Sequence, residues 1–203
     1  MSGNLVRQQI INKIEKGNLV ENADITHCVS PASYELRVGS YRERHIDRRI
    51  DLSVGEQIAI PPNGFILIGT IERVNIPLDI IGMMYLRSTY ARRGFLSWFQ
   101  GIVDPGYSGG LTIVLHNLTG ELIPLSGGER ICHLVFETLP EPVDQGYEGA
   151  YQGSEGATPP ANPPMRIVGK MSETPGVYNP ELSKLLLEAL QKNPEEFLRR
   201  LLY

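Results

Sequence analysis

The stretch "GIVDPGYSGGLTIVLHN" (residues 101–117) contains a short apolar run, a tight turn and a longer second run. Asp104-Pro105-Gly106 is a turn signal, because proline and glycine favour the backbone angles of tight turns. The residues after the turn alternate between two faces, as in a half-buried strand. One face holds Leu111, Ile113 and Leu115, and the more polar face holds Thr112, Val114 and His116. We therefore expect a strand, a turn with Asp104 at its mouth, and a second strand, in the manner of a hairpin.

Similar short runs, alternating or apolar, flank this stretch on both sides and are separated by turn signals such as Pro-Pro-Asn-Gly and Ser-Gly-Gly. The runs are "SYELRVGSY" (33–41), "QIAIPP" (57–62), "GFILIGTIERV" (64–74), "ELIPL" (121–125) and "ICHLVFETL" (131–139). Many short strands with turn signals between them favour an all-β barrel or sandwich.

Helical patterns lie at the two ends of the chain. "LVRQQIINKIEKGN" (5–18) predicts a short amphipathic helix that ends at Gly17. Its apolar face holds Val6, Ile10, Ile11 and Ile14. Near the other end, Asn179-Pro180-Glu181 and Asn193-Pro194-Glu195 are helix-start signals followed by a leucine stripe. Such a stripe needs cover, on its own domain, on a sister subunit or on a protein partner.

Residues 144–165 are rich in glycine, proline and small polar residues, and they predict no regular element. They fit a linker, or an arm that uses Tyr147 and Tyr151 to fold over a ligand. The predicted organisation is a β domain with its N-terminal helix (1–143), a Gly/Pro-rich arm (144–170) and an amphipathic helical tail (171–203).

Composition limits the possible partners and compartments. The chain has 203 residues, of which 41% are hydrophobic, and a formal net charge of −4. This balance disfavours binding to a nucleic-acid polymer. No apolar run approaches the roughly 20 residues of a membrane span, and no signal peptide is evident, so we expect a cytoplasmic protein. Cys28 and Cys132 are expected to be free thiols in a reducing compartment.

Most common catalytic motifs are missing from the sequence. Two isolated cysteines cannot supply a zinc-deaminase site, and there is no Walker loop, Gly-x-Ser-x-Gly motif or dinucleotide fingerprint. The four histidines form no recognisable metal-ligand spacing. What remains is "YLRSTYARRGF" (85–95), whose Arg87, Ser88, Arg92 and Arg93 suit either a phosphate cradle or a solvated basic face.

Residues 1 to about 158 resemble the dCTP deaminase and dUTPase superfamily. Six stretches match in order: "SPASYELRVGS", "PPNGFILIGTIERVNIP", "LRSTYARRGF", "GIVDPGYSGGLTIVLHN", "GGERICHLVFETL" and "YEGAYQG". The N-terminal helix and "LRSTYARRGF" are similar to the deaminase branch. The resemblance implies a distorted jelly-roll-like β fold of the dUTPase type, and a homotrimer with nucleotide sites between subunits.

The resemblance also implies roles for individual residues. Arg87, Ser88 and Arg92 would contact the phosphates or the catalytic water, and Asp104 would lie beneath the deoxyribose. Tyr107 would exclude a 2′-hydroxyl, and backbone groups of the turn and its strand would read the base. The implied substrate contacts also include Gly101, Tyr151 and Gln152. Mg²⁺ would be carried by the triphosphate, with no protein side chain ligating it directly.

One position separates the two activities of this superfamily. Its deaminases use a strand glutamate as the proton carrier, and that glutamate belongs at position 114, where this chain has Val114. Valine transfers no proton. Phosphoester hydrolysis needs a carboxylate to orient water, and Asp104 with Arg87, Ser88 and Arg92 meets that need. "GIVDPGY" also resembles a dUTPase pattern, so we expect hydrolysis of dUTP to dUMP and pyrophosphate.

Four residues depart from the family pattern. Glu35 stands where dUTPases usually have aspartate, and it could hold metal-bound water or cap structure. His133 replaces a glutamine, Ala150 a lysine or arginine, and Ser154 a glutamine. Two alternatives therefore stay open. One is a dCTP deaminase, perhaps bifunctional, whose acid is Glu121 or Glu35. The other is a catalytically silent nucleotide-binding regulatory protein.

Overall fold

The computed structural model describes residues 3–17, 19–43, 48–97 and 101–161. Its helices are Arg7–Glu15 (α1), Ile25–Cys28 (α2) and Ser88–Arg92 (α3). Its strands are Gly3–Asn4 (β1), Val20–Glu21 (β2), Tyr34–Glu43 (β3), Ile50–Asp51 (β4), Gln57–Ile60 (β5), Phe65–Asn75 (β6), Ile80–Leu86 (β7), Phe95–Leu96 (β8), Ile102–Val103 (β9), Ser108–Asn117 (β10), Ile123–Ser126 (β11) and Arg130–Thr138 (β12). Every run that the sequence predicted as a strand forms one.

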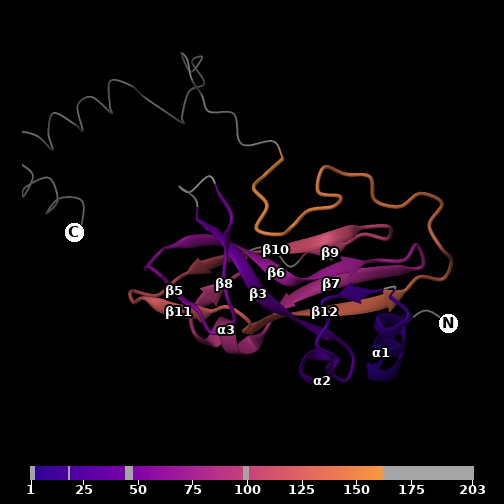
Figure 1. The fold of residues 1–203 in the computed structure, drawn as a ribbon, viewed down its shortest axis with the longest axis horizontal. Coiled ribbons are helices and arrows are strands. Elements are labelled where there is room, and N and C mark those ends of the chain that lie inside the picture. The colour runs from indigo at the N-terminus through magenta and orange to yellow at the C-terminus, as the bar shows by residue number, and fades with distance from the viewer. Residues whose placement is uncertain (1–2, 18, 44–47, 98–100, 162–203) are drawn as a thin grey trace, which may run out of the picture. The chain divides into compact units, whose positions relative to one another are not determined.

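The strands form a curled antiparallel sheet in the order β8-β10-β6-β3-β12-β7-β9, and β5 and β11 pair separately (Figure 1). β3 joins the two parts of the large sheet, since it pairs with β6 on one side and with β12 on the other. A sheet that curls in this way buries one face of each strand against the others. The prediction of an all-β, jelly-roll-like fold is confirmed.

The stretch 101–117 is not a hairpin, and this corrects the sequence-based expectation. β9 pairs with β7, whereas β10 pairs with β6 and β8, so the turn carries the chain from one part of the sheet to another. The Tyr107 amide donates to the Asp104 carbonyl at 3.1 Å, and Gly106 has a φ of 82°. These are features of a type II turn with proline at its second position. The turn does not join two paired strands. Two backbone hydrogen bonds attach it to Ile76, which directly follows β6.

Alternation along β10 follows the predicted pattern. Leu111, Ile113 and Leu115 are buried in the core, and Thr112, Val114 and His116 are half-buried on the other face. In α1, Ile10 and Ile14 are buried and Ile11 is partly buried, as expected. Val6 is 54% exposed, so its assignment to the apolar face was wrong. It occupies the N-cap position, where the backbone is extended and the side chain leaves the helix surface.

Glu72 is a fully buried carboxylate in the middle of the sheet. It accepts hydrogen bonds from the Arg37 backbone amide at 2.8 Å and from Arg37 Nε at 2.6 Å. The Tyr34 hydroxyl also donates to it, at 3.1 Å. Burial, reinforced by the charge of Glu72, raises the pKa of Tyr34 well above its usual value. The cluster compensates the charge of the buried acid, as a stable buried ion pair requires.

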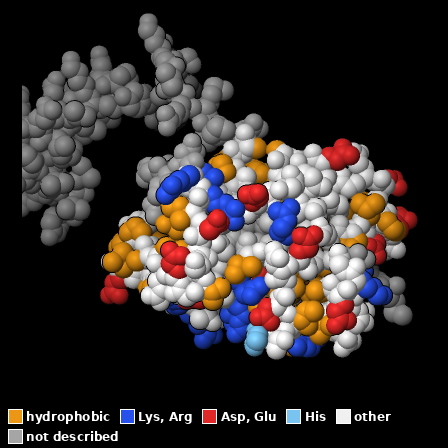
Figure 2. All heavy atoms as spheres, in the orientation of Figure 1, with side chains coloured by type: hydrophobic (Ala, Val, Ile, Leu, Met, Phe, Trp, Pro, Cys, Tyr) orange, Lys and Arg blue, Asp and Glu red, His pale blue; other side chains and the backbone are white. Residues whose placement is uncertain are grey.

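Residues 144–161 pack against the β domain and run beside β10, as the orange ribbon of Figure 1 shows. The rest of the predicted arm and the predicted helical tail (171–203) lie outside the described residues. In the part of the chain that is described, no helix has the length and apolarity to cross a membrane. Basic and acidic side chains are interspersed on the face drawn in Figure 2.

Candidate functional site

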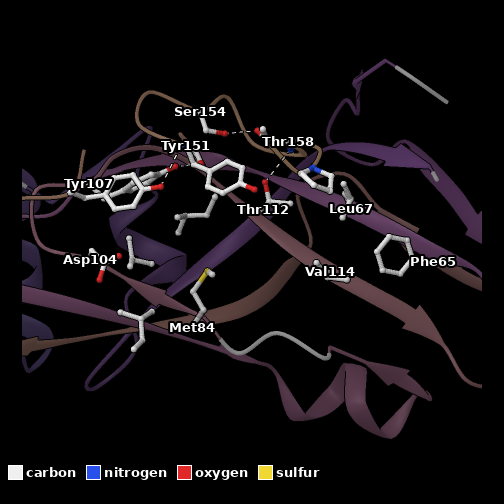
Figure 3. A pocket seen from close by; sticks show the side chains of 16 residues that line it. Phe65, Leu67, Met84, Asp104, Tyr107, Thr112, Val114, Tyr151, Ser154 and Thr158 are labelled. Carbon is white, nitrogen blue, oxygen red and sulfur yellow. Dashed lines mark hydrogen bonds between the residues drawn. The ribbon is translucent and has the colours of Figure 1, made fainter. Parts of the chain in front are cut away.

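A pocket of about 480 Å³ opens beside β10. It lies against β6, β7 and β9, and the arm covers one side of it (Figure 3). Its lining is predominantly apolar and aromatic: Phe65, Leu67, Met84, Ile102, Val103, Asp104, Tyr107, Gly110, Leu111, Thr112, Val114, Tyr147, Tyr151, Ser154, Thr158 and Pro160. A concave apolar pocket with a few polar groups is the usual form of a small-molecule site.

Asp104 is the one carboxylate among the described residues that line this pocket. It directly follows β9 and begins the turn to β10, and its side chain is exposed. In Figure 3 it lies at one end of the pocket, and Phe65 lies at the other. A single acid at the edge of an apolar pocket can orient a water molecule toward a ligand held inside it.

Val114 lies near the far end of the pocket, in the wall formed by β10 and β6 (Figure 3). It is directly opposite Leu67 in the register of these two strands, and Phe65 is opposite His116. Alternation places Leu67 and Phe65 on the same face as Val114. This end of the pocket is therefore aliphatic and aromatic, and none of the β10 and β6 residues that line it is acidic.

Tyr107 lies between the turn and the arm and is 7% exposed. Its hydroxyl donates to the Gly110 carbonyl at 2.8 Å, and its ring meets Tyr147 edge-on, with 5.4 Å between ring centroids. Burial raises the pKa of Tyr107, so the phenol stays protonated at neutral pH. The side chain forms a rigid wall of the pocket.

The other residues predicted to contact substrate near the turn have different positions. Tyr151 lines the pocket, and its hydroxyl accepts from the Ala161 amide at 3.1 Å. Gly101 is buried, and its carbonyl accepts from the Met84 amide at 2.9 Å. Gln152 does not line the pocket, and its side-chain amide is hydrogen-bonded to backbone groups of the turn, of the start of β10 and of the arm.

Arg87, Ser88 and Arg92 are grouped on and beside α3, at the predicted strand-to-helix junction. None of the three lines the pocket with Asp104. Ser88 and Arg92 are exposed. Arg87 is held in place, since its Nη1 donates to the Arg130 carbonyl at 2.8 Å and its Nε lies 3.4 Å from Glu35 Oε1. Within one copy of the chain, the candidate phosphate-binding residues on and beside α3 are therefore not part of the candidate pocket.

Glu35 is a buried acid beside this arginine group. Its second carboxylate oxygen accepts from Arg130 Nη1 at 2.8 Å, and His133 Nδ1 lies 3.8 Å from the first. Burial lowers the pKa of His133, although the charge of Glu35 opposes this shift. With both oxygens of Glu35 beside arginine, the acid positions Arg87. It does not line the pocket as an alternative proton carrier would, and neither does the exposed Glu121.

A protein-built metal cage is not formed by the part of the chain that the structure describes, since no group of three histidine, cysteine or acidic side chains converges there. Mg²⁺ in proteins is usually bound by one or two carboxylates together with substrate phosphates and water. The pocket's one carboxylate, Asp104, makes no cage of its own, so an ion used here would have to arrive on the phosphates of a nucleotide. Such an ion would neutralise charge on those phosphates.

Several residues of the pocket were not predicted from the sequence. Phe65 and Leu67 were found only as part of a strand, although alternation already placed them on one face of it. The pairing of β6 with β10 then brings that face beside Val114. Thr158 donates its amide to Thr112 Oγ1 at 3.1 Å, and no sequence signal marks that contact.

Known proteins are similar in sequence to this chain. A family model described as dCTP deaminase-like matches residues 4–139. The dCTP deaminase of Thermococcus gammatolerans is 42% identical over 143 residues, which cover 70% of this chain and 88% of that relative. The probable deoxyuridine 5′-triphosphate nucleotidohydrolase of Sulfolobus islandicus rod-shaped virus 1 is 35% identical over 154 residues, covering 75% and 88%.

A solved structure is similar as well. The 2′-deoxycytidine 5′-triphosphate deaminase of Agrobacterium tumefaciens aligns with a TM-score of 0.56 at 20% identity. The alignment covers 68% of this chain and 48% of that one, so this chain spans about half of its length. At this identity the likeness concerns the fold. Fold and pocket define an all-β protein with a candidate small-molecule site beside Asp104. The chain belongs to the dCTP deaminase-like family.

Proposed function

We propose that this protein hydrolyses dUTP to dUMP and pyrophosphate in the presence of Mg²⁺. The observation that carries the proposal is the contrast between two residues of one pocket. Asp104 provides a carboxylate at one end, and Val114 provides an aliphatic wall where a deaminase needs its proton carrier. A pocket built in this way supports chemistry at phosphorus better than chemistry on the base.

In this mechanism the base enters the apolar end of the pocket and the sugar lies against Tyr107. The Asp104 carboxylate accepts a hydrogen bond from a water molecule and aims its oxygen at the α-phosphorus. A new P–O bond forms as the bond from the α-phosphorus to the bridging oxygen breaks, and pyrophosphate leaves. The proton of the attacking water passes to Asp104 and then to solvent. Arg87 and Arg92 stabilise the charge that develops on the phosphates, together with the Ser88 hydroxyl.

The complete site in this proposal requires more than one copy of the chain. The group around α3 does not line the pocket that contains Asp104. A homotrimer in which a neighbour contributes Arg87, Ser88 and Arg92 would bring the two halves together. Tyr151 and Gly101 would complete the contacts to the nucleotide from the arm and the loop before β9.

A dCTP deaminase is the second candidate, and the names of the relatives favour it, since the Thermococcus protein is a dCTP deaminase at 42% identity. A nucleotide-binding protein without turnover is the third, because Ala150 is exposed on the arm where the family has a cation. The two enzymatic candidates differ in their products. The third yields no product.

The test is product analysis with the purified full-length chain, Mg²⁺ and each of dUTP, dCTP, dTTP, dATP and dGTP. We expect dUMP and pyrophosphate from dUTP. In ¹⁸O-labelled water the label should appear in dUMP, because water attacks the α-phosphorus. Formation of dUTP from dCTP would establish the deaminase instead. Nucleotide-dependent thermal stabilisation without any product would establish the silent protein.

A further inference from the structure

The side chain of Gln152 is fully engaged with backbone groups. Its Oε1 accepts from the Ser108 amide at 2.9 Å. Its Nε2 donates to the Gly106 carbonyl at 2.9 Å and to the Tyr147 carbonyl at 3.2 Å. One side chain thus joins the turn 104–107 and the start of β10 to the arm.

Backbone hydrogen bonds extend this contact on both sides. The Tyr147 amide donates to the Pro105 carbonyl, and the Gly153 amide donates to the Ser108 carbonyl, each at 2.8 Å. Further along, the Gly110 amide donates to the Ser154 carbonyl at 2.7 Å. The arm is therefore fastened along residues 105–110, and Gln152 lies in the middle of the fastened segment.

Glycines make room for this close approach. A Cβ on Gly106 would lie 2.6 Å from Gly146 Cα, and a Cβ on Gly110 would lie 2.9 Å from the Glu155 carbonyl carbon. Neither distance is compatible with a side chain unless the backbone moves. Gly106 also has a φ of 82°, which favours glycine. The glycines of the turn and of β10 thus allow the backbone of the arm to pack directly against them.

We infer that Gln152 is a positioning residue for Asp104 and makes no contact with the nucleotide. Asp104 begins the same turn whose Gly106 carbonyl and following Ser108 amide are held by Gln152. Fixing this turn fixes the direction of the Asp104 carboxylate, which water activation requires. The catalytic part of this inference rests on the proposed hydrolysis, whereas the fastening of the turn does not.

Two substitutions separate this role from a substrate contact. Gln152→Met keeps the length of the side chain and removes all three hydrogen bonds. Gln152→Glu keeps one acceptor but turns a donor into an oxygen that faces two carbonyls. Gln145→Met is the matched control, because Gln145 is an exposed arm residue whose amide donates to Glu148 Oε2 at 3.0 Å.

The first measurement is steady-state hydrolysis of dUTP. We expect kcat to fall about 10- to 100-fold in Gln152→Met, with KM changed less than about threefold, because a small misplacement of a catalytic group costs rate more than binding. Gln152→Glu should fall at least as far, and Gln145→Met should resemble the parent. A rise in KM at unchanged kcat would show a substrate contact and overturn the inference.

The second measurement does not depend on activity. Amide hydrogen exchange at Ser108, with the folded state verified by thermal unfolding, should accelerate about tenfold or more in Gln152→Met and stay unchanged in Gln145→Met. Unchanged exchange at Ser108 would overturn the inference. If Gln152→Met does not fold, Gln152→Asn, which keeps the amide one methylene short, carries the same two measurements. A parent protein that does not hydrolyse dUTP, but whose Ser108 is protected by Gln152, would refute the proposed function and leave the fastening intact.

Discussion

Val114 lies directly opposite Leu67 in the β10–β6 pair, and both side chains line the pocket that contains Asp104. This cross-strand pair makes the wall aliphatic at the position where a deaminase of the superfamily is expected to have glutamate. A substitution at Val114 is therefore the most direct way to test whether the pocket can be changed from dUTP hydrolysis to dCTP deamination.

Replacing Val114 with glutamate should introduce deamination of dCTP. The new carboxylate would enter the half-buried wall beside Leu67, where partial desolvation raises a carboxyl pKa and suits it to proton transfer. General acid–base help is worth about 10²–10⁴-fold in rate. Val114→Gln, of similar size without an acid, is the control. Conversion of dCTP, followed by ultraviolet absorbance, should rise with glutamate alone; equal rates in both variants would show that position 114 does not face the base.

Replacing Asp104 with asparagine should abolish most hydrolysis and leave the fold intact. The variant loses the proton acceptor while it keeps the shape of the side chain, so kcat should fall about 10²–10⁴-fold. Since Asp104 is exposed, the free energy of unfolding should change by less than about 0.5 kcal/mol. Chemical denaturation and pyrophosphate release measure the two effects. Retention of more than a tenth of the parent kcat would remove Asp104 from the mechanism.

Replacing Glu72 with alanine should destabilise the protein strongly. Glu72 is fully buried and accepts hydrogen bonds from Arg37 and Tyr34, so its loss removes the nearest counter-ion of the Arg37 guanidinium and the acceptor of the Tyr34 hydroxyl. Breaking a buried pair costs about 3–5 kcal/mol. Asp51→Ala is the control, because Asp51 pairs with Arg49 at 2.9 Å on the surface, where such pairs contribute about 0–1 kcal/mol. Urea denaturation should separate the two variants; similar midpoints would contradict the buried network.

Stability should depend on pH through His133. Burial lowers the pKa of this histidine below its ordinary value of 6.5. The folded state therefore binds fewer protons than the unfolded state, and the contribution to stability is present above pH 6.5 and is lost as pH falls through the folded pKa. His133→Gln should flatten the loss of stability between about pH 7 and pH 5, the range around an ordinary histidine pKa. Parallel profiles from thermal unfolding in this range would count against the shift.

Thiol reactivity should reveal both cysteines as buried and free. Cys28 and Cys132 are buried and unpaired as a disulfide, and burial raises the pKa of the Cys132 thiol to about 12. The thiolate is the reactive form, so both should react slowly with a disulfide reagent at pH 8 in the native protein and rapidly in denaturant. Two thiols titrated in denaturant, and none during the first minutes under native conditions, is the expected result. Rapid native labelling of Cys132 would show that its surroundings open to solvent.

The apolar pattern of the sequence was sufficient to predict the strands and to identify the residues of β10 that face the core. Alternation has a period of two, so Leu111, Ile113 and Leu115 must share a face wherever the strand lies. It was equally sufficient for α1, where Ile10 and Ile14 recur at helical spacing. The prediction that Val6 belongs to the apolar face of α1 was wrong. Val6 lies at the helix boundary, outside the helical period, and the apolar pattern does not locate that boundary.

Only the tertiary structure decided which strands pair and what the polar side chains contact. Local sequence marks a turn at Asp104-Pro105-Gly106, but the partner of β9 is a distant strand, β7, so an expected hairpin became a crossover. The sequence also does not predict the contacts of Gln152, because a side-chain amide can bind either a ligand or a backbone group. The packing of the arm shows that it binds backbone groups. Periodicity is a property of consecutive residues and is readable along the chain, whereas pairing and hydrogen bonding between distant segments depend on how the whole sheet closes.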